Sequence, residues 1–166
     1  MLDSAFFDIL IKSYFYFKIY LFVYFRIMAY IKSRMDKKIL DRIKQVRISS
    51  GISARRLGRL SGLSTTSICN FENGSMPSMK NLAKIIDALE LHINEKLFVK
   101  LLKAKRDSLN ASLEKIGRIS GVSHSIIHKA EQGILPSTKT CCIIANELDL
   151  PLDELIEWPK IPIKQP

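Results

Sequence analysis

"SGLSTTSICNFENG" occupies residues 61–74, and "SGVSHSIIHKAEQG" occupies residues 120–133, which lie 59 residues further along the chain. Serine, glycine, isoleucine and glutamate recur at matching positions of the two stretches, whereas the letters between them differ. When residues 36–97 are aligned without gaps on residues 95–156, 20 of 62 positions are identical. Self-similarity at a fixed period is typical of a repeated structural unit. The sequence therefore predicts two tandem copies of one small domain.

Each copy is predicted to consist of short helices separated by turns. In the first copy, Ser53, Ser64 and Ser78 precede three of these helices and are suited to cap them, and Gly62 is suited to the turn between two of them. Apolar residues recur at helical spacing, and no segment alternates apolar and polar residues as a strand does. The predicted fold class is therefore all-α. The residues expected to face the core are Ile39, Leu40, Ile43, Val46, Leu57, Leu60, Ile68, Phe71, Leu82, Ile85, Ile86, Leu89, Leu91, Ile93 and Leu97 in the first copy, and Ile116, Ile119, Val122, Ile127, Ile144, Leu148, Leu150 and Leu152 in the second.

Composition separates the beginning of the chain from the repeats. The chain has one Trp, five Tyr and eight Phe, and 11 of these 14 aromatic residues lie within residues 1–35. The predicted organisation is an aromatic leader at 1–35, a first helical domain at 36–97, a second at 98–157 and a Pro-rich tail at 158–166.

The leader leaves three interpretations open. Residues 14–31 are nearly all apolar and are just long enough to cross a bilayer as a helix. Lys18 and Arg26 interrupt this run, and each charge costs ~2.5–3.5 kcal/mol near the bilayer centre. As an inner-membrane anchor, the leader would keep the repeats in the cytoplasm. The slightly favoured interpretation is upstream sequence read as coding, with Met28 or Met35 as the start, and the third is a helix that packs on the repeats.

The charge balance and the cysteines narrow the class of protein. The formal net charge of +10 favours a polyanionic partner, either nucleic acid or an anionic membrane surface. The three cysteines form no CxxC pair and the three histidines form no cluster, which argues against a metal site and favours a reducing, cytoplasmic compartment. Cys141 and Cys142 align with Leu82 and Ala83, and are expected to fill the core. No catalytic triad, carboxylate pair or Gly-rich phosphate loop is present, so neither an enzyme nor a cofactor is expected.

The residues around the glycine turn follow a recognisable pattern. Two helices joined by a short glycine turn, the second capped by serine, form a helix-turn-helix. The pattern runs Arg47, Leu57-Gly58, Ser61-Gly62-Leu63-Ser64, Ile68, Glu72-Asn73-Gly74, Pro77, Leu82, Leu89. It resembles the five-helix DNA-binding domain of phage repressors and Cro, and the second copy resembles this domain as well. Together the two matches cover about residues 37–157. The resemblance implies two tandem five-helix domains, each docking its recognition helix in the major groove of double-stranded DNA.

The resemblance also places the base-contacting positions on the outward face of each recognition helix. Asn70 can pair with adenine and Lys129 with guanine, and a threonine methyl can pack on thymine. The two copies differ at all four positions, so two readers would read unlike half-sites. The alternatives are a solvated helix face and, for the two histidines, a metal pair that lacks a third ligand. The eight residues are Thr65, Thr66, Cys69, Asn70, His124, Ser125, His128 and Lys129.

Cationic side chains and helix N-termini of the first copy are the candidate phosphate contacts. They are Ser53, Arg55, Arg56, Arg59, Ser78 and Lys80. In the family that the chain resembles, a glutamine usually follows the cap of the second helix and binds phosphate. Ala54 and Leu113 occupy those positions here, so the expected affinity of both copies for DNA is lower.

Two pairs of opposite charge recur at the same separation. Arg47 precedes Glu72 by 25 residues, and Arg106 precedes Glu131 by 25 residues. The resemblance implies that each pair forms a partly buried salt bridge between the first and third helices of its copy. Their expected role is therefore in the fold.

The second copy departs further from a DNA-binding surface than the first. Residues 98–166 carry a net charge of +2, whereas residues 36–97 carry +5. Extra apolar residues of the second copy favour contact with protein, either the other copy or another chain. These residues are Ile126, Ile134, Leu135 and Ile143, which replace Ser67, Ser75, Met76 and Lys84.

The preferred interpretation is a transcriptional regulator that binds double-stranded DNA sequence-specifically in the cytoplasm. The alternative is an antitoxin-like or other protein-interaction module of the same fold, whose second copy binds an identical chain or another protein.

Overall fold

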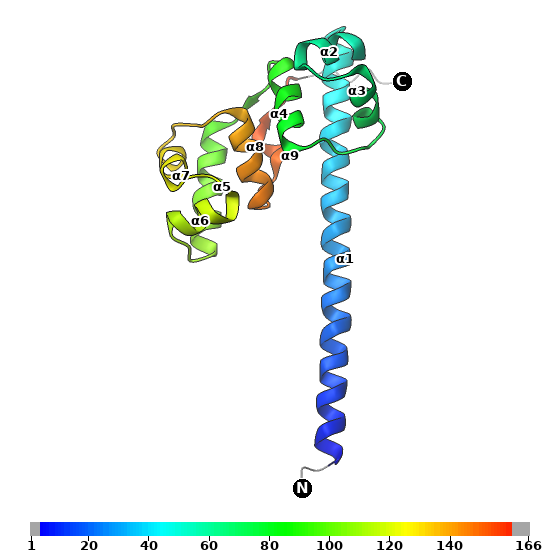
Figure 1. The fold of residues 1–166 in the computed structure, drawn as a ribbon, viewed down its shortest axis with the longest axis vertical. Helices are drawn as coiled ribbons and strands as arrows, with labels where there is room; N and C mark the ends of the chain where they lie inside the picture. Colours follow the sequence, from blue (N-terminus) through cyan, green and yellow to red (C-terminus); the bar gives the residue numbers. More distant parts are fainter. Residues whose placement is uncertain (1–3, 161–166) are drawn as a thin grey trace. The chain divides into compact units, whose positions relative to one another are not determined.

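The computed structural model (Figure 1) describes the backbone of residues 4–160 and the side chains of residues 14, 16–24, 26 and 37–160. The helices are α1 (Ser4–Ser49), α2 (Ala54–Ser61), α3 (Thr65–Glu72), α4 (Met79–Ala88), α5 (Glu95–Ser108), α6 (Leu113–Ser120), α7 (His124–Glu131), α8 (Thr138–Glu147) and α9 (Leu152–Leu155). Two short strands, β1 (His92–Ile93) and β2 (Ile156–Glu157), pair antiparallel. The all-α prediction is confirmed, and the two-residue strands are an addition to it.

The repeat seen in the sequence recurs in the helix bounds. Helices α6, α7 and α8 begin and end 59 residues after α2, α3 and α4. The serine caps explain most of these starts, because a serine hydroxyl accepts a hydrogen bond from the backbone N–H three residues ahead. This bond is present at Ser53, Ser64 and Ser78 of the first copy and at Ser112 and Ser137 of the second. Ser123, which precedes α7, makes no such bond.

Helix α5 belongs to both copies. Asn94 caps it by accepting a hydrogen bond from the Leu97 N–H, and Phe98 and Leu102 of this helix are fully buried. It follows α4 as the fifth helix of the first copy and precedes α6 as the first helix of the second. The boundary placed between residues 97 and 98 lies inside α5, so a continuous helix joins the copies. The fifth helix of the second copy is α9, a single turn that passes into β2.

The predicted core residues are buried or half-buried with two exceptions. Leu60 is 54 % exposed and Ile119 is 41 % exposed, so the prediction that both face inward is wrong. The buried residues of α2 are Leu57, Gly58 and Ser61. At 3.6 residues per turn, this face is centred between Leu57 and Gly58, and Leu60 lies at its edge. The same reasoning applies to Ile119 of α6.

The two copies share one hydrophobic core. Helix α4 packs against α8 (Figure 1), and the buried residues of both helices belong to a single cluster with those of α1 and α5. Cys141 and Cys142 lie in this cluster, as predicted, and burial raises the pKa of their thiols to about 11 and about 12. Both side chains therefore remain protonated at neutral pH and act as small apolar groups.

A buried carboxylate fastens the end of the second copy to the first helix of the first copy. Asp153 accepts hydrogen bonds or ion-pair contacts from Lys38 at 2.6 Å and Arg42 at 2.9 Å. The Arg42 guanidinium also lies 4.7 Å from the centre of the Trp158 ring, whose Nε1 donates to the Asp153 carbonyl oxygen at 2.7 Å. Burial opposes ionisation of Asp153, but the bonds from Lys38 and Arg42 outweigh it and hold the pKa of the carboxyl below its ordinary value.

Replacing Asp153 is expected to lower stability in a pH-dependent way. A carboxyl whose pKa is depressed in the folded state stabilises the fold above its unfolded pKa, about 3.9, and loses this contribution as the pH falls further. Asp153→Asn should therefore reduce the free energy of unfolding by about 1–2 kcal/mol at pH 7, a value discounted because Lys38 and Arg42 remain partly in solvent. The difference from the unmodified chain should shrink below about pH 4.

Urea unfolding at pH 7 and pH 3 measures this difference. Glu154→Gln is the control, because Glu154 is an exposed carboxylate of the same helix. A loss of equal size at both pH values would show that the ion pairs do not stabilise the fold.

The first part of α1, up to residue 37, is a separate compact unit. Its described aromatic side chains are exposed, with Tyr16 and Tyr20 each at 71 %. Within the described part of the chain, no helix combines the length and the apolar character needed to cross a membrane.

Candidate nucleic-acid interface

The two helices of each helix-turn-helix approach closely at a glycine. A Cβ atom added at Gly58 would lie 2.8 Å from the Leu63 carbonyl oxygen, and one added at Gly117 would lie 2.7 Å from the Val122 carbonyl oxygen. No side chain fits at such distances from backbone, so the approach of α2 to α3, and of α6 to α7, requires glycine there. This explains why both copies have glycine at this position although their exposed residues differ.

The turn between the helices is also the same in both copies. Gly62 and Gly121 end α2 and α6 in the left-handed region, each at φ 65°. The residue before each glycine is a buried serine whose hydroxyl donates back to its own helix, Ser61 to Leu57 O at 2.7 Å and Ser120 to Ile116 O at 2.9 Å. The turn therefore leaves no buried hydroxyl without a partner and sets the direction in which α3 and α7 begin.

A salt bridge anchors α3 and α7 to the first helix of their respective copies, as the sequence predicts. Arg47 donates to both carboxylate oxygens of Glu72, with Nη2 at 2.9 Å from Oε2, and its Nη1 donates to the Ile52 carbonyl oxygen at 2.7 Å. The bond to Glu72 raises the pKa of Arg47. In the second copy, Arg106 Nε donates to Glu131 Oε1 at 2.7 Å. The Arg106 side chain is 28 % exposed against 12 % for Arg47, so the first pair is the better shielded from water.

Removing the carboxylate from each pair should therefore have unequal effects. Glu72→Ala leaves Arg47 buried without its bidentate partner, and should lower the free energy of unfolding by about 3 kcal/mol. Glu131→Ala should cost less, because the more exposed Arg106 can be hydrated. Thermal unfolding of the two variants beside the unmodified chain measures the order, and an equal or larger loss for Glu131→Ala would contradict it.

All eight predicted base-contacting side chains are exposed. In α3, Ile68 is buried and fixes the inward face, so the opposite face presents the four residues of the first copy. In α7, Ile127 and Ala130 are buried and the four residues of the second copy point outward. His128 lies 3.4 Å from Gln132 between their Nε2 atoms. Among the described residues, no group of three His, Cys, Asp or Glu side chains is arranged to hold a metal ion.

The candidate phosphate contacts of the first copy are also exposed, from Ser53 at the start of α2 to Lys80 in the first turn of α4. The hydroxyls of Ser53 and Ser78 accept from Arg56 N and Asn81 N. Their oxygens are thus engaged in capping, and the donors left for a phosphate at these helix starts are backbone N–H groups.

The second copy retains cations that the sequence reasoning did not single out. Lys115, Arg118 and Lys139 align with Arg56, Arg59 and Lys80, and all three are exposed. The 59-residue offset was the signal that could have found them. Glu114, however, replaces Arg55. Hydrogen bonds from its own backbone N–H and from Ser112 hold the pKa of this carboxyl below its ordinary value, so a negative charge occupies the start of α6.

The extra apolar residues of the second copy differ in their exposure to solvent. Leu135 is half-buried and faces residues of the first copy across a cavity, whereas Ile134 beside it is 61 % exposed. Ile126 and Ile143 are half-buried. Leu135 therefore lies near residues of the first copy, whereas Ile134 is available to solvent.

A family model described as helix-turn-helix matches the chain twice, at residues 43–96 and 102–155. The chain belongs to the helix-turn-helix family. The two matched stretches cover more than half of the chain and contain every predicted site residue, and the family consists of DNA-binding regulatory domains. No curated protein and no solved structure shows a significant match to the chain.

Proposed function

We propose that the protein is a transcriptional regulator that binds double-stranded DNA sequence-specifically, with α3 and α7 as recognition helices in the major groove. One observation carries this proposal. The two helix-turn-helix copies keep the same glycines, caps and salt bridges, and they differ at all four outward positions of the recognition helix. Two domains that bind different base sequences are expected to share an equivalent scaffold and to differ in the exposed residues of the recognition helix.

The first copy is the stronger reader in this proposal. Its outward positions include the Asn70 amide, which can bond both N6 and N7 of adenine, and the Thr65 and Thr66 methyl groups, which can pack on thymine. Arg55, Arg56 and Arg59 lie exposed on the adjacent helix α2 and supply the positive charge that phosphates attract. The second copy offers Lys129 for guanine, but Glu114 opposes phosphate at the start of α6.

The mechanism proposed for regulation is occupancy. A chain bound at a promoter blocks polymerase or recruits it, depending on where its site lies, and neither outcome requires turnover or a cofactor. Binding to chromosomal DNA in a bacterium would place the protein in the cytoplasm.

Two alanine variants separate base reading from phosphate binding. Asn70→Ala should weaken binding to the preferred duplex by about 1–3 kcal/mol and leave binding to random duplexes nearly unchanged. Arg59→Ala should weaken both and reduce the slope of log K against log salt by about one unit.

Fluorescence anisotropy at four salt concentrations measures both effects. Lys96→Ala on α5 is the control for loss of one positive charge outside the helix-turn-helix, and should leave the slope nearly unchanged. If Asn70→Ala and Arg59→Ala gave the same pattern, the proposed orientation of α3 in the groove would be wrong.

A second candidate function is an antitoxin-like module whose second copy binds a protein, either an identical chain or another one. The exposure of Ile134 favours it, because a large apolar side chain stands in solvent where the first copy has Ser75. Ile134→Ser should then lower affinity for the captured protein by at least about tenfold without changing DNA affinity. Capture of a protein with tight affinity by a chain that binds no duplex would favour this function over the first.

A further inference from the structure

Equivalent helices of the two copies pack against each other. Helix α4 of the first copy contacts α8 of the second, and these helices occupy positions 59 residues apart with identical bounds in the repeat. Their buried faces are also equivalent: Leu82, Ala83, Ile85 and Ile86 in α4, and Cys141, Cys142, Ile144 and Ala145 in α8. The contact is therefore made by equivalent helices, and the faces that they bury in the shared core are equivalent as well.

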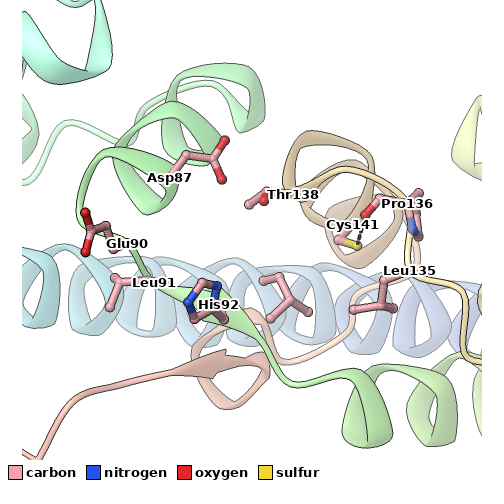
Figure 2. Close-up of a pocket in the computed structure, with 9 residues that line it drawn as sticks. Asp87, Glu90, Leu91, His92, Leu135, Pro136, Thr138 and Cys141 are labelled. Atoms are coloured by element: carbon pink, nitrogen blue, oxygen red, sulfur yellow. Dashed lines mark hydrogen bonds between the residues drawn. The ribbon is translucent and has the colours of Figure 1, made fainter.

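The two helices run in opposite directions. A cavity of about 360 Å³ is lined on one side by Asp87 near the end of α4 and by the residues that follow, Glu90 to Ile93. Its other side is formed by Leu135 and Pro136, which precede α8, and by Thr138 and Cys141 in the first turn of α8 (Figure 2). The end of α4 thus lies beside the beginning of α8, which is the arrangement of an antiparallel helix pair.

A short antiparallel ladder also joins the first copy to the end of the second. His92 pairs with Glu157 and Ile93 with Ile156 in the β1–β2 ladder. The Asn94 N–H donates to the Leu155 carbonyl oxygen at 2.8 Å, which extends the pairing by one residue. β1 and β2 do not occupy equivalent positions of the repeat, because residues 92–93 correspond to residues 151–152, so this ladder joins the copies without defining their symmetry.

An antiparallel contact of one patch with its own equivalent is a two-fold relation. In a symmetric dimer such an interface is called isologous, whereas copies related by a simple shift along an axis would pack two different patches with the helices parallel. The two copies of this chain are therefore related by an approximate two-fold rotation, although they are joined head to tail in sequence through α5.

We propose that one chain binds two unlike half-sites arranged in inverted orientation on the duplex. This inference rests on the proposed function, in which α3 and α7 are both readers. A two-fold rotation that relates the readers also relates the two strands that they face, so the half-sites run in opposite directions. They are unlike because all four outward positions differ between α3 and α7. Because both readers belong to one chain and their relation is set by the packing of α4 against α8, a single chain suffices for the whole site.

The experiment uses the full chain and a selection of bound duplexes from a random library. The half-site that loses base preference in Asn70→Ala belongs to the first copy, and the half-site that loses it in Lys129→Ala belongs to the second. Synthetic duplexes then carry the two half-sites either inverted or in direct orientation, with spacings varied base by base over one helical turn, about 10 base pairs. Affinity is measured by anisotropy and stoichiometry by native mass spectrometry.

The inverted duplex at its best spacing should bind at least about tenfold more tightly than every direct duplex, with one chain per duplex. A direct arrangement that binds as tightly or more tightly would overturn the proposal, as would a requirement for two chains or recovery of only one half-site. Absence of any preference over random duplexes would instead reject the proposed function, and the inference with it.

The two-fold packing can also be tested without DNA. In a Cys69→Ser background, a spin label attached at Glu90→Cys is expected to broaden the methyl resonances of Leu135 in the free chain, because both residues line the same cavity. Absence of this broadening in a folded chain would contradict the antiparallel packing of α4 and α8 on which the inference depends.

Discussion

The packing of α4 against α8 is the contact on which the arrangement of the two copies depends. At two equivalent positions α4 carries the larger residue, Leu82 against Cys141 and Ile86 against Ala145. At a third equivalent position the order is reversed, because Cys142 stands where α4 has Ala83. Small residues on one helix leave room for larger ones on its neighbour, so both helices can pack at the density of a protein interior.

Helix α5 adds a second constraint of a different kind. Its Phe98 and Leu102 are fully buried in a core that includes residues from both copies. A small domain of about 60 residues buries a modest fraction of its surface and is marginally stable alone. By sharing a helix and a core, the two copies stabilise each other in a way that two domains on a flexible linker do not. The Asp153 contacts with Lys38 and Arg42 fasten the free end of the second copy into the same assembly.

Most of the local structure could be predicted from the sequence, because its causes lie within a few residues of each other. The serine caps, the glycine turns and the apolar positions of Ile68 and Ile127 are short-range signals. Each of these signals occurs in both copies, which strengthens the prediction. The misplacement of Leu60 and Ile119 has a simple reason. Both were assigned inward on helical spacing from Leu57 and Ile116, whereas Gly58 and Gly117 turn the buried face of α2 and α6 to the other side. A glycine has no apolar side chain to reveal the buried face in the sequence, although Gly58 and Gly117 mark the points where α2 approaches α3 and α6 approaches α7.

The contacts between the copies could not be predicted in the same way. The sequence of α5 does not indicate that this helix belongs to both copies. The first copy needs a fifth helix at this point of the chain, and the second copy needs a first helix there. Asp153 aligns with Asn94, which caps α5, and the sequence offers no sign that its equivalent accepts bonds from Lys38 and Arg42 more than 100 residues away. In the candidate interface, the repeat and the family resemblance predict the outward residues. Lys115, Arg118 and Lys139 follow from the 59-residue offset alone, because Glu114 and the lower net charge make the second copy a weaker phosphate-binding surface in sequence.

The internal two-fold relation has a consequence for how such a protein can change over generations. In a dimer of identical chains, every substitution in a recognition helix appears twice, so both halves of the binding site must change together and stay palindromic. In this chain a substitution in α3 leaves α7 untouched. One half of the recognised sequence can then drift while the other keeps the protein on its site. The route from one binding site to another is thereby divided into two smaller steps.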